Sequence, residues 1–114
     1  MNTLVHWDIP STDLAKSKAF YQKLFGWKME QWSEQYVLFS GPGGFGGGIS
    51  KAKKVAKPCL DVYIEVASIP ASLKKAVALG GKVAQPKTAI GGNMGYMAFL
   101  FDPCGCRIGL WSKK

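Results

Sequence analysis

The chain has 114 residues, 47% of them hydrophobic, and its 15 basic and seven acidic side chains give a formal charge of +8. This length suits one domain with its own core, and no apolar run approaches the roughly 18 residues that would span a bilayer. The lysines are scattered over separate segments without a nucleic-acid-binding motif. We therefore expect neither a membrane nor a nucleic acid as partner. The basic residues indicate a solvated surface, with a preference for anionic ligands as the alternative.

The first part of the chain predicts a strand, a helix and three further strands. Residues 4–10 (LVHWDIP) alternate between apolar and polar side chains, as in a half-buried strand. Ser11, Thr12 and Asp13 are good cap residues for a helix over 13–25, which stops before Gly26. Strands then follow over 26–32, 35–40 and 45–51, with glycine-rich turns at 41–48.

The second part repeats this order. A strand over 59–66 precedes a helix over 69–80, which Ser68 caps and which carries Pro70 in its first turn. Strands over 82–85, 96–101 and 106–112 complete the pattern. The sequence therefore predicts an α+β domain, residues 1–114, made of two tandem β-α-β-β-β repeats (1–52 and 58–114, linker 53–57). Their curved mixed sheet is expected to enclose a cleft.

Strand alternation separates a core face from a cleft face. In the first strand Val5, Trp7 and Ile9 face the core, so His6 and Asp8 face the cleft. The same alternation in the other strands places on the cleft side Gly48, Ser50, Asp61, Tyr63, Glu65, Arg107, Gly109 and Trp111. The phenylalanines Phe39, Phe99 and Phe101 are expected in the core.

His6 and Asp61 hold equivalent places in the two repeats. A pseudo-two-fold relation between the repeats would bring the imidazole and the carboxylate together. Such a pair is either the beginning of a divalent-metal site or an ordinary hydrogen-bonded pair.

The N-terminus shows no charged segment followed by an apolar stretch, so no secretory signal is predicted. Cys59, Cys104 and Cys106 form an odd set, which favours reduced thiols and a cytoplasmic protein. Cys106 is expected to be buried and unreactive, and Cys104 to be exposed at a turn.

Three stretches carry a resemblance to a known family: AFYQKLFGW (19–27), LGGKV (79–83) and FDPCGCRIGLW (101–111). With the duplicated layout, the chain resembles the glyoxalase, bleomycin-resistance and extradiol-dioxygenase superfamily, also called the vicinal oxygen chelate superfamily. The resemblance covers almost the whole chain. It implies a small-molecule site between the repeats and a homodimer.

The resemblance also implies a metal held by four protein ligands, one from each of four cleft-facing strand positions. His6 falls on the first of these positions and Asp61 on its equivalent in the second repeat. The other two positions usually carry carboxylates, but here they fall near Gly48 and on Gly109. Glycine has no ligating side chain, so the resemblance implies an incomplete site and a weakly bound divalent metal at most.

Three functions follow, and the sequence leaves open whether the protein is an enzyme. The first is binding of a small molecule in the cleft, with ligand-binding residues His6, Asp61, Tyr63, Arg107 and Trp111. The alternative is a metal-dependent lyase, isomerase or dioxygenase, with His6 and Asp61 holding the metal and Glu65 or Asp8 as catalytic base. A non-catalytic interaction domain is the third.

Overall fold

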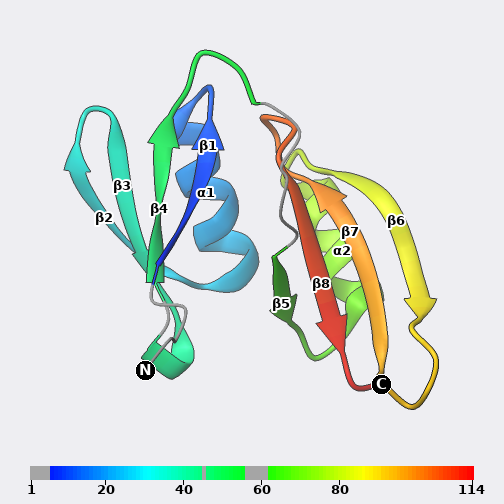
Figure 1. Ribbon diagram of the computed structural model, residues 1–114. Helices are drawn as coiled ribbons and strands as arrows, with labels where there is room; N and C mark the ends of the chain where they lie inside the picture. The colour runs from blue at the N-terminus through cyan, green and yellow to red at the C-terminus, as the bar shows by residue number, and fades with distance from the viewer. Residues whose placement is uncertain (1–5, 45, 56–61) are drawn as a thin grey trace. The chain divides into compact units, whose positions relative to one another are not determined.

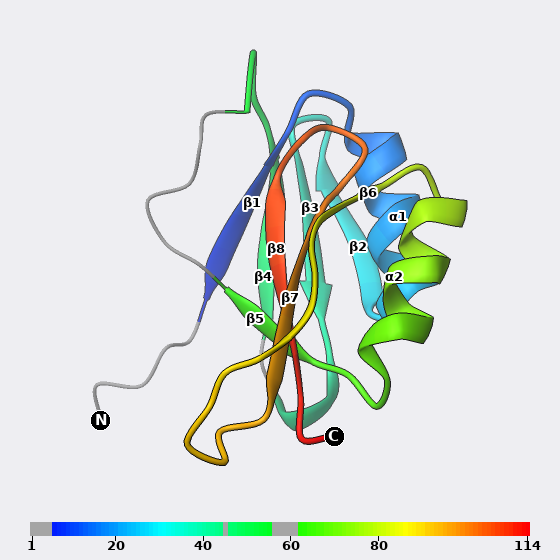
Figure 2. The same cartoon turned by 90° about the vertical axis from the view of Figure 1, so that its right-hand side faces the viewer.

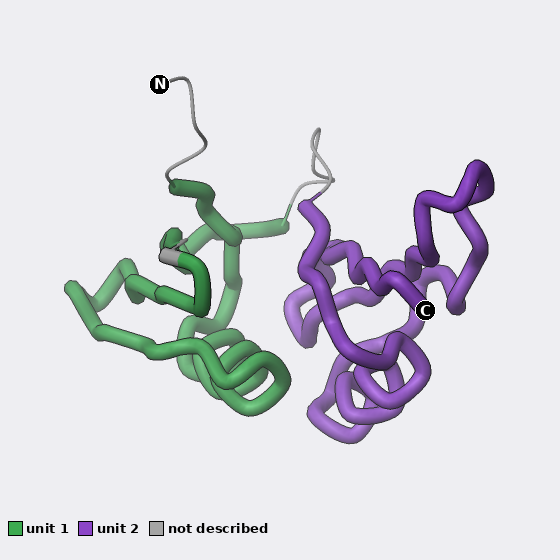
Figure 3. The backbone as a smooth tube through the Cα atoms, turned by 90° about the horizontal axis from the view of Figure 1, so that it is seen from below, with its two compact units in different colours: residues 1–55 green, residues 56–114 purple. Residues whose placement is uncertain are grey.

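The protein forms two compact units, Met1–Val55 and Ala56–Lys114, in a computed structural model that describes residues 6–44, 46–55 and 62–114. Figure 3 colours the two units separately. Each unit contains one four-stranded mixed sheet and one α-helix among the described residues. The same order of elements, β-α-β-β-β, occurs twice (Figure 1), which confirms the predicted α+β fold class.

Unit 1 begins with strand β1 (Trp7–Ser11) and helix α1 (Leu14–Phe25). Strands β2 (Lys28–Ser33) and β3 (Tyr36–Ser40) follow, then a short 3-10 turn η1 (Pro42–Gly44) and strand β4 (Gly46–Lys51). The sheet order is β1-β4-β3-β2. β1 runs parallel to β4, and the other pairs are antiparallel.

Unit 2 repeats this topology with strand order β5-β8-β7-β6. Its elements are β5 (Tyr63–Glu65), α2 (Ile69–Ala78), β6 (Lys82–Ala89), β7 (Tyr96–Phe101) and β8 (Arg107–Ser112). β5 is parallel to β8, as β1 is to β4. No helix within the described ranges is long and apolar enough to cross a membrane.

The helix ends follow local side-chain chemistry. The Asp13 carboxylate accepts a hydrogen bond from the amide of Lys16 (3.2 Å), and Gly26 ends α1 in the left-handed region at φ 72°. In unit 2 the Ser68 hydroxyl accepts from the amide of Ala71 (3.2 Å). Both predicted helix starts are confirmed to within a residue, and α2 ends two residues before the predicted position 80.

The largest boundary error is in β6, which was expected over 82–85 and extends to Ala89. Its pairing with β7 shifts register twice, between Val83 and Gln85 and between Gln85 and Thr88. Pro86 lies in the second irregular stretch and provides no amide hydrogen for the ladder. An edge strand with two register shifts loses the simple alternation on which the prediction relied.

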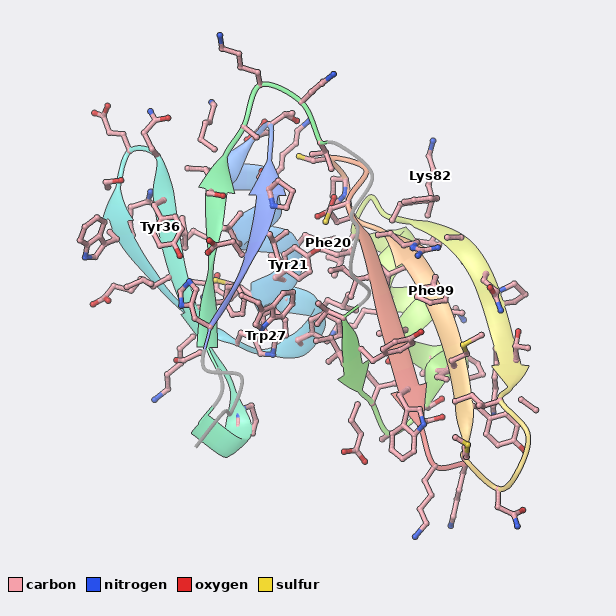
Figure 4. The ribbon with its side chains drawn as sticks, in the orientation of Figure 1. Phe20, Tyr21, Trp27, Tyr36, Lys82 and Phe99 are labelled. Atoms are coloured by element: carbon pink, nitrogen blue, oxygen red, sulfur yellow. The ribbon has the colours of Figure 1, made fainter. Side chains whose placement is uncertain are left out.

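The core of unit 1 is an aromatic cluster between α1 and the sheet. The Trp27 indole is 3% exposed, and its ring centroid lies 4.7 Å from that of Phe39, 4.8 Å from Phe25 and 5.7 Å from Tyr21. Figure 4 shows Phe20, Tyr21 and Trp27 beside α1, away from Tyr36 on β3. In unit 2 the helix face of the sheet buries Ala98, Leu100, Ile108 and Leu110 against α2.

Each helix covers only one face of the sheet in its own unit (Figures 1 and 2). We call the opposite face the open face. Phe101 corrects a predicted core position: its side chain is 38% exposed, because it pairs with Arg107 on the open face of β7. Phe99 is buried as predicted, at 6% exposure, but it too lies on the open face, opposite Gly109.

The turn before β8 is organised by Asp102, which is 3% exposed. Its Oδ1 accepts hydrogen bonds from the backbone amides of Cys104 and Cys106, both at 2.9 Å. Cys106 is buried as expected, and burial, with the charges of Asp102 and Cys104, raises the pKa of its thiol to about 12. Cys104 is half-buried, so the predicted exposure of this cysteine is wrong.

Candidate functional site

The open face of unit 1 is defined by the register of its strands. Asp8 pairs with Gly48, and Gly48 pairs with Leu38, so these three positions form one row across the sheet. Tyr36 pairs with Ser50 in the next row. Side chains of paired residues lie on the same face of a sheet. The open face of unit 1 therefore holds His6, Asp8, Tyr36, Leu38, Gly48 and Ser50.

Three of these side chains form a hydrogen-bonded cluster, the His6–Asp8–Tyr36 triad. The Tyr36 hydroxyl donates to Asp8 Oδ1 at 2.6 Å. Nε2 of His6 lies 2.8 Å from the Tyr36 oxygen and 3.0 Å from the same Asp8 Oδ1. The His6 and Tyr36 rings are stacked, with centroids 6.5 Å apart. The structure thus joins the two cleft-facing residues predicted for the first strand through a tyrosine of β3.

The proton positions in the triad follow from its geometry. Because the phenol proton points at Asp8, Nε2 of His6 must carry a hydrogen to bond either oxygen. Burial raises the pKa of Tyr36 from 10.0 to about 12, and its hydrogen bond to Asp8 and the negative charge of that carboxylate add to the rise. The phenol therefore stays a neutral donor at physiological pH.

A titration of tyrosinate absorbance tests this arrangement. We expect the wild-type minus Tyr36→Phe difference to show a midpoint near pH 12, and Asp8→Asn to move it toward the ordinary value of 10.0. Since the folded state keeps this proton to a higher pH than the unfolded chain, the stabilisation it provides is present below about pH 10 and is lost as pH rises through about 12. A wild-type midpoint at 10, with circular dichroism unchanged, would contradict the triad.

Gly48 provides the space in which the Tyr36 phenol lies. A Cβ at position 48 would overlap both the hydroxyl oxygen and Cζ of Tyr36. A glycine inside a strand often marks such a close approach by another group. By the resemblance, a ligating carboxylate is expected near this position, where the phenol of a tyrosine from the neighbouring strand β3 lies instead.

Gly109 in unit 2 likewise lies against a tyrosine ring from the neighbouring strand. A Cβ there would lie 2.7 Å from Cδ1 of Tyr63 and 3.0 Å from the Val62 carbonyl oxygen. The Tyr63 ring is 46% exposed, and its centroid lies 5.5 Å from that of Phe99. The Arg107 guanidinium lies over the Phe99 ring, with its Cζ 4.5 Å from the ring centroid. Tyr63 and Arg107, predicted separately as ligand-binding residues, thus meet on one phenylalanine.

Two further predicted site residues, Glu65 and Trp111, lie on the open face of unit 2. Glu65 is exposed on β5 and pairs with Trp111 on β8. The Trp111 indole donates through Nε1 to the backbone oxygen of Met94 at 2.9 Å, which fixes part of the turn between β6 and β7. Asp61 lies outside the described residues, so its pairing with His6 stays a prediction.

The described residues do not fit the metal site that the resemblance implies. Within residues 6–44, 46–55 and 62–114, no three His, Cys, Asp or Glu side chains lie close enough to hold an ion. His6 and Asp8 provide two donors, but Nε2 and Oδ1 bond each other and Tyr36. The resemblance implies a third ligand near Gly48, and the space beside that glycine is occupied by the Tyr36 phenol.

Tyr36 is the site residue that the sequence patterns do not predict. Its position can be found in hindsight, since Val37 and Phe39 are core residues and alternation then places Tyr36 on the open face. The adjacent pair Gly47–Gly48 is the second signal, because consecutive glycines in a strand leave room for a ring on each face.

Comparisons with known proteins agree with this architecture. A family model described as "Bleomycin resistance protein-like N-terminal" matches residues 3–42. The candidate glyoxylase CFP32 of Mycobacterium tuberculosis is 30% identical over 125 residues, covering 94% of this chain and 44% of CFP32. A glyoxylase-like domain-containing protein of Didymella fabae is 26% identical and covers 86% of this chain and 84% of the fungal protein. The chain thus spans less than half the length of its mycobacterial relative.

Solved structures with the same fold cover nearly all of the chain. A glyoxalase/bleomycin resistance protein/dioxygenase family enzyme of Burkholderia phytofirmans matches with a TM-score of 0.81 at 16% identity, covering 96% of this chain and 97% of that one. FosX, a fosfomycin resistance protein of Listeria monocytogenes solved with Mn(II) and sulfate, matches with a TM-score of 0.81 at 18% identity, covering 98% and 90%. The fold, the relatives and the family model together support the resemblance of this chain to the glyoxalase, bleomycin-resistance and dioxygenase superfamily.

Proposed function

We propose that the protein binds a small molecule on the open faces of its sheets without the metal typical of its superfamily. The main support for this proposal is that tyrosine rings lie against two glycines near which ligating carboxylates are expected by resemblance. Tyr36 covers Gly48 and Tyr63 covers Gly109. Both positions therefore present aromatic rings and hydrogen-bonding groups, which suit an organic ligand better than an ion.

The open face of unit 2 has the features of a stacking site. Half-exposed Tyr63 presents a ring, and Arg107 brings a positive charge next to it through the shared contact with Phe99. A planar anion can stack on the ring and place its charge near the guanidinium. The formal charge of +8 favours the approach of such an anion.

A metal-dependent lyase or dioxygenase gains less support from the geometry. FosX was solved with Mn(II), and the mycobacterial relative is a candidate glyoxylase. In this chain the predicted base Asp8 is hydrogen-bonded to Tyr36 and His6, and neither Gly48 nor Gly109 leaves room for a carboxylate side chain. We therefore place ligand binding first and metal-dependent catalysis second.

Three probes of nearly equal shape test the charge preference: benzoate, benzamide and benzamidinium. We expect benzoate to bind most tightly and benzamidinium least, measured by chemical-shift changes in amide NMR spectra. Tyr63→Ala should weaken benzoate binding about three- to tenfold, the range of a stacking interaction of about 0.5–1.5 kcal/mol.

The matched control is Val77→Ala, because Val77 is 52% exposed on α2 and lies away from the open face. That variant should bind benzoate as the wild type does. If neither these probes nor a wider panel of aromatic and anionic metabolites shifts the spectrum or the melting temperature, the proposed function is wrong.

A further inference from the structure

We infer that the Tyr36 phenol takes the place of a metal-binding carboxylate in unit 1, so that positions 36 and 48 must change together before this face can hold a metal ion. This inference concerns the disagreement between the described residues and the superfamily's metal site. It does not depend on which organic ligand the protein binds, and its test involves no such ligand.

Two potential metal ligands, His6 and Asp8, already lie close together in unit 1. Asp8 lies on β1 and His6 immediately precedes that strand, and their donor atoms are 3.0 Å apart. Asp8 is the register partner of Gly48 on the adjacent strand, and neighbouring strands are about 4.8 Å apart. A carboxylate introduced at position 48 would thus be next to Asp8, on the same face.

The Tyr36 phenol blocks the introduction of a ligand at position 48. Any Cβ at position 48 overlaps the end of the Tyr36 ring, so a longer side chain can enter only if the phenol leaves. The phenol is held by its hydrogen bonds to Asp8 (2.6 Å) and His6 (2.8 Å). Gly48→Glu alone therefore breaks the triad or disturbs the sheet.

The variants differ in the number of side chains that can bind a metal ion on this face. Tyr36→Ala alone releases the imidazole and the Asp8 carboxylate, but two protein ligands hold a divalent ion poorly. Tyr36→Ala with Gly48→Glu adds the third donor and gives one imidazole and two carboxylates. Nitrogen and oxygen sets of this kind suit Mn²⁺, Zn²⁺ and related ions.

The experiment compares four proteins: the wild type, Tyr36→Ala, Gly48→Glu and the double variant. Calorimetry measures the affinity for Mn²⁺, and NMR follows paramagnetic broadening of His6, which is the only histidine in the chain. We expect the double variant to bind Mn²⁺ about tenfold or more tightly than each of the other three, with broadening of the His6 signals.

The control is Tyr36→Ala with Gly48→Gln, which has nearly the same shape without the added charge. Equal Mn²⁺ affinity in this control and in the glutamate variant would overturn the inference. The same holds if the wild type already binds Mn²⁺ as tightly as the double variant, or if the folded double variant gains no affinity.

A stability cycle keeps the inference testable if the glutamate variants fold poorly. Gly48→Ala should lower the urea midpoint in the wild type, because its Cβ displaces the phenol, and should have little effect in the Tyr36→Ala background. An equal loss of stability in both backgrounds would show that the Tyr36 ring does not occupy this space.

Discussion

Trp27→Ala is expected to destabilise the protein by about 3–5 kcal/mol, the usual cost of truncating a buried tryptophan to alanine. The indole is 3% exposed and contacts the rings of Phe25, Tyr21 and Phe39. Alanine is much smaller than the indole, so the substitution leaves a cavity between α1 and the sheet. Urea unfolding followed by circular dichroism measures the loss.

Trp32→Ala is the matched control for this change. Its indole is 71% exposed on β2, so the same substitution should alter stability by no more than about 0.5 kcal/mol. Similar losses in the two variants would contradict the assignment of Trp27 to the centre of the unit 1 core.

Gly47→Ala is expected to cost about 3 kcal/mol, at the upper end of overpacking effects. A Cβ at this position overlaps the Trp7 carbonyl oxygen and lies 2.6 Å from Cζ of Phe39. The carbonyl belongs to the β1 backbone beside β4, and Phe39 is 3% exposed in the aromatic cluster. Neither group can move aside without loss of pairing or packing.

Gly46→Ala serves as the comparison on the same strand. There the nearest atom to an added Cβ is the Phe39 carbonyl oxygen at 3.1 Å, which requires only a small adjustment. We expect its loss of stability to be less than half that of Gly47→Ala in thermal or urea unfolding. Equal losses would mean that general strand propensity, and not the local collision, sets the cost.

The fold could be predicted largely because its signals are local. Asp13 and Ser68 cap the helices through contacts three residues away, and Gly26 ends α1 through its own backbone conformation. Ile9 and Ile49 are fully buried, as strand alternation requires. The error at β6 arises where Pro86 and two register shifts interrupt that alternation.

The site could be predicted only in part, because its contacts cross strands. Alternation places His6 and Asp8 on the open face, but their partner Tyr36 is 28 residues from Asp8 and depends on the register of β3 against β4. The resemblance implies ligand positions near Gly48 and on Gly109 that lack a side chain. In the structure the Tyr36 phenol lies over Gly48, and the half-exposed Tyr63 ring lies over Gly109.

A Mn²⁺ titration of the wild-type protein tests whether these tyrosines stand in place of metal ligands. The His6 signals provide the readout, since no other histidine contributes to that part of the NMR spectrum. We expect the His6 signals to stay sharp as equimolar Mn²⁺ is added at sub-millimolar protein concentration. Stoichiometric broadening of His6 under the same conditions, with Tyr36 and Gly48 unchanged, would contradict it.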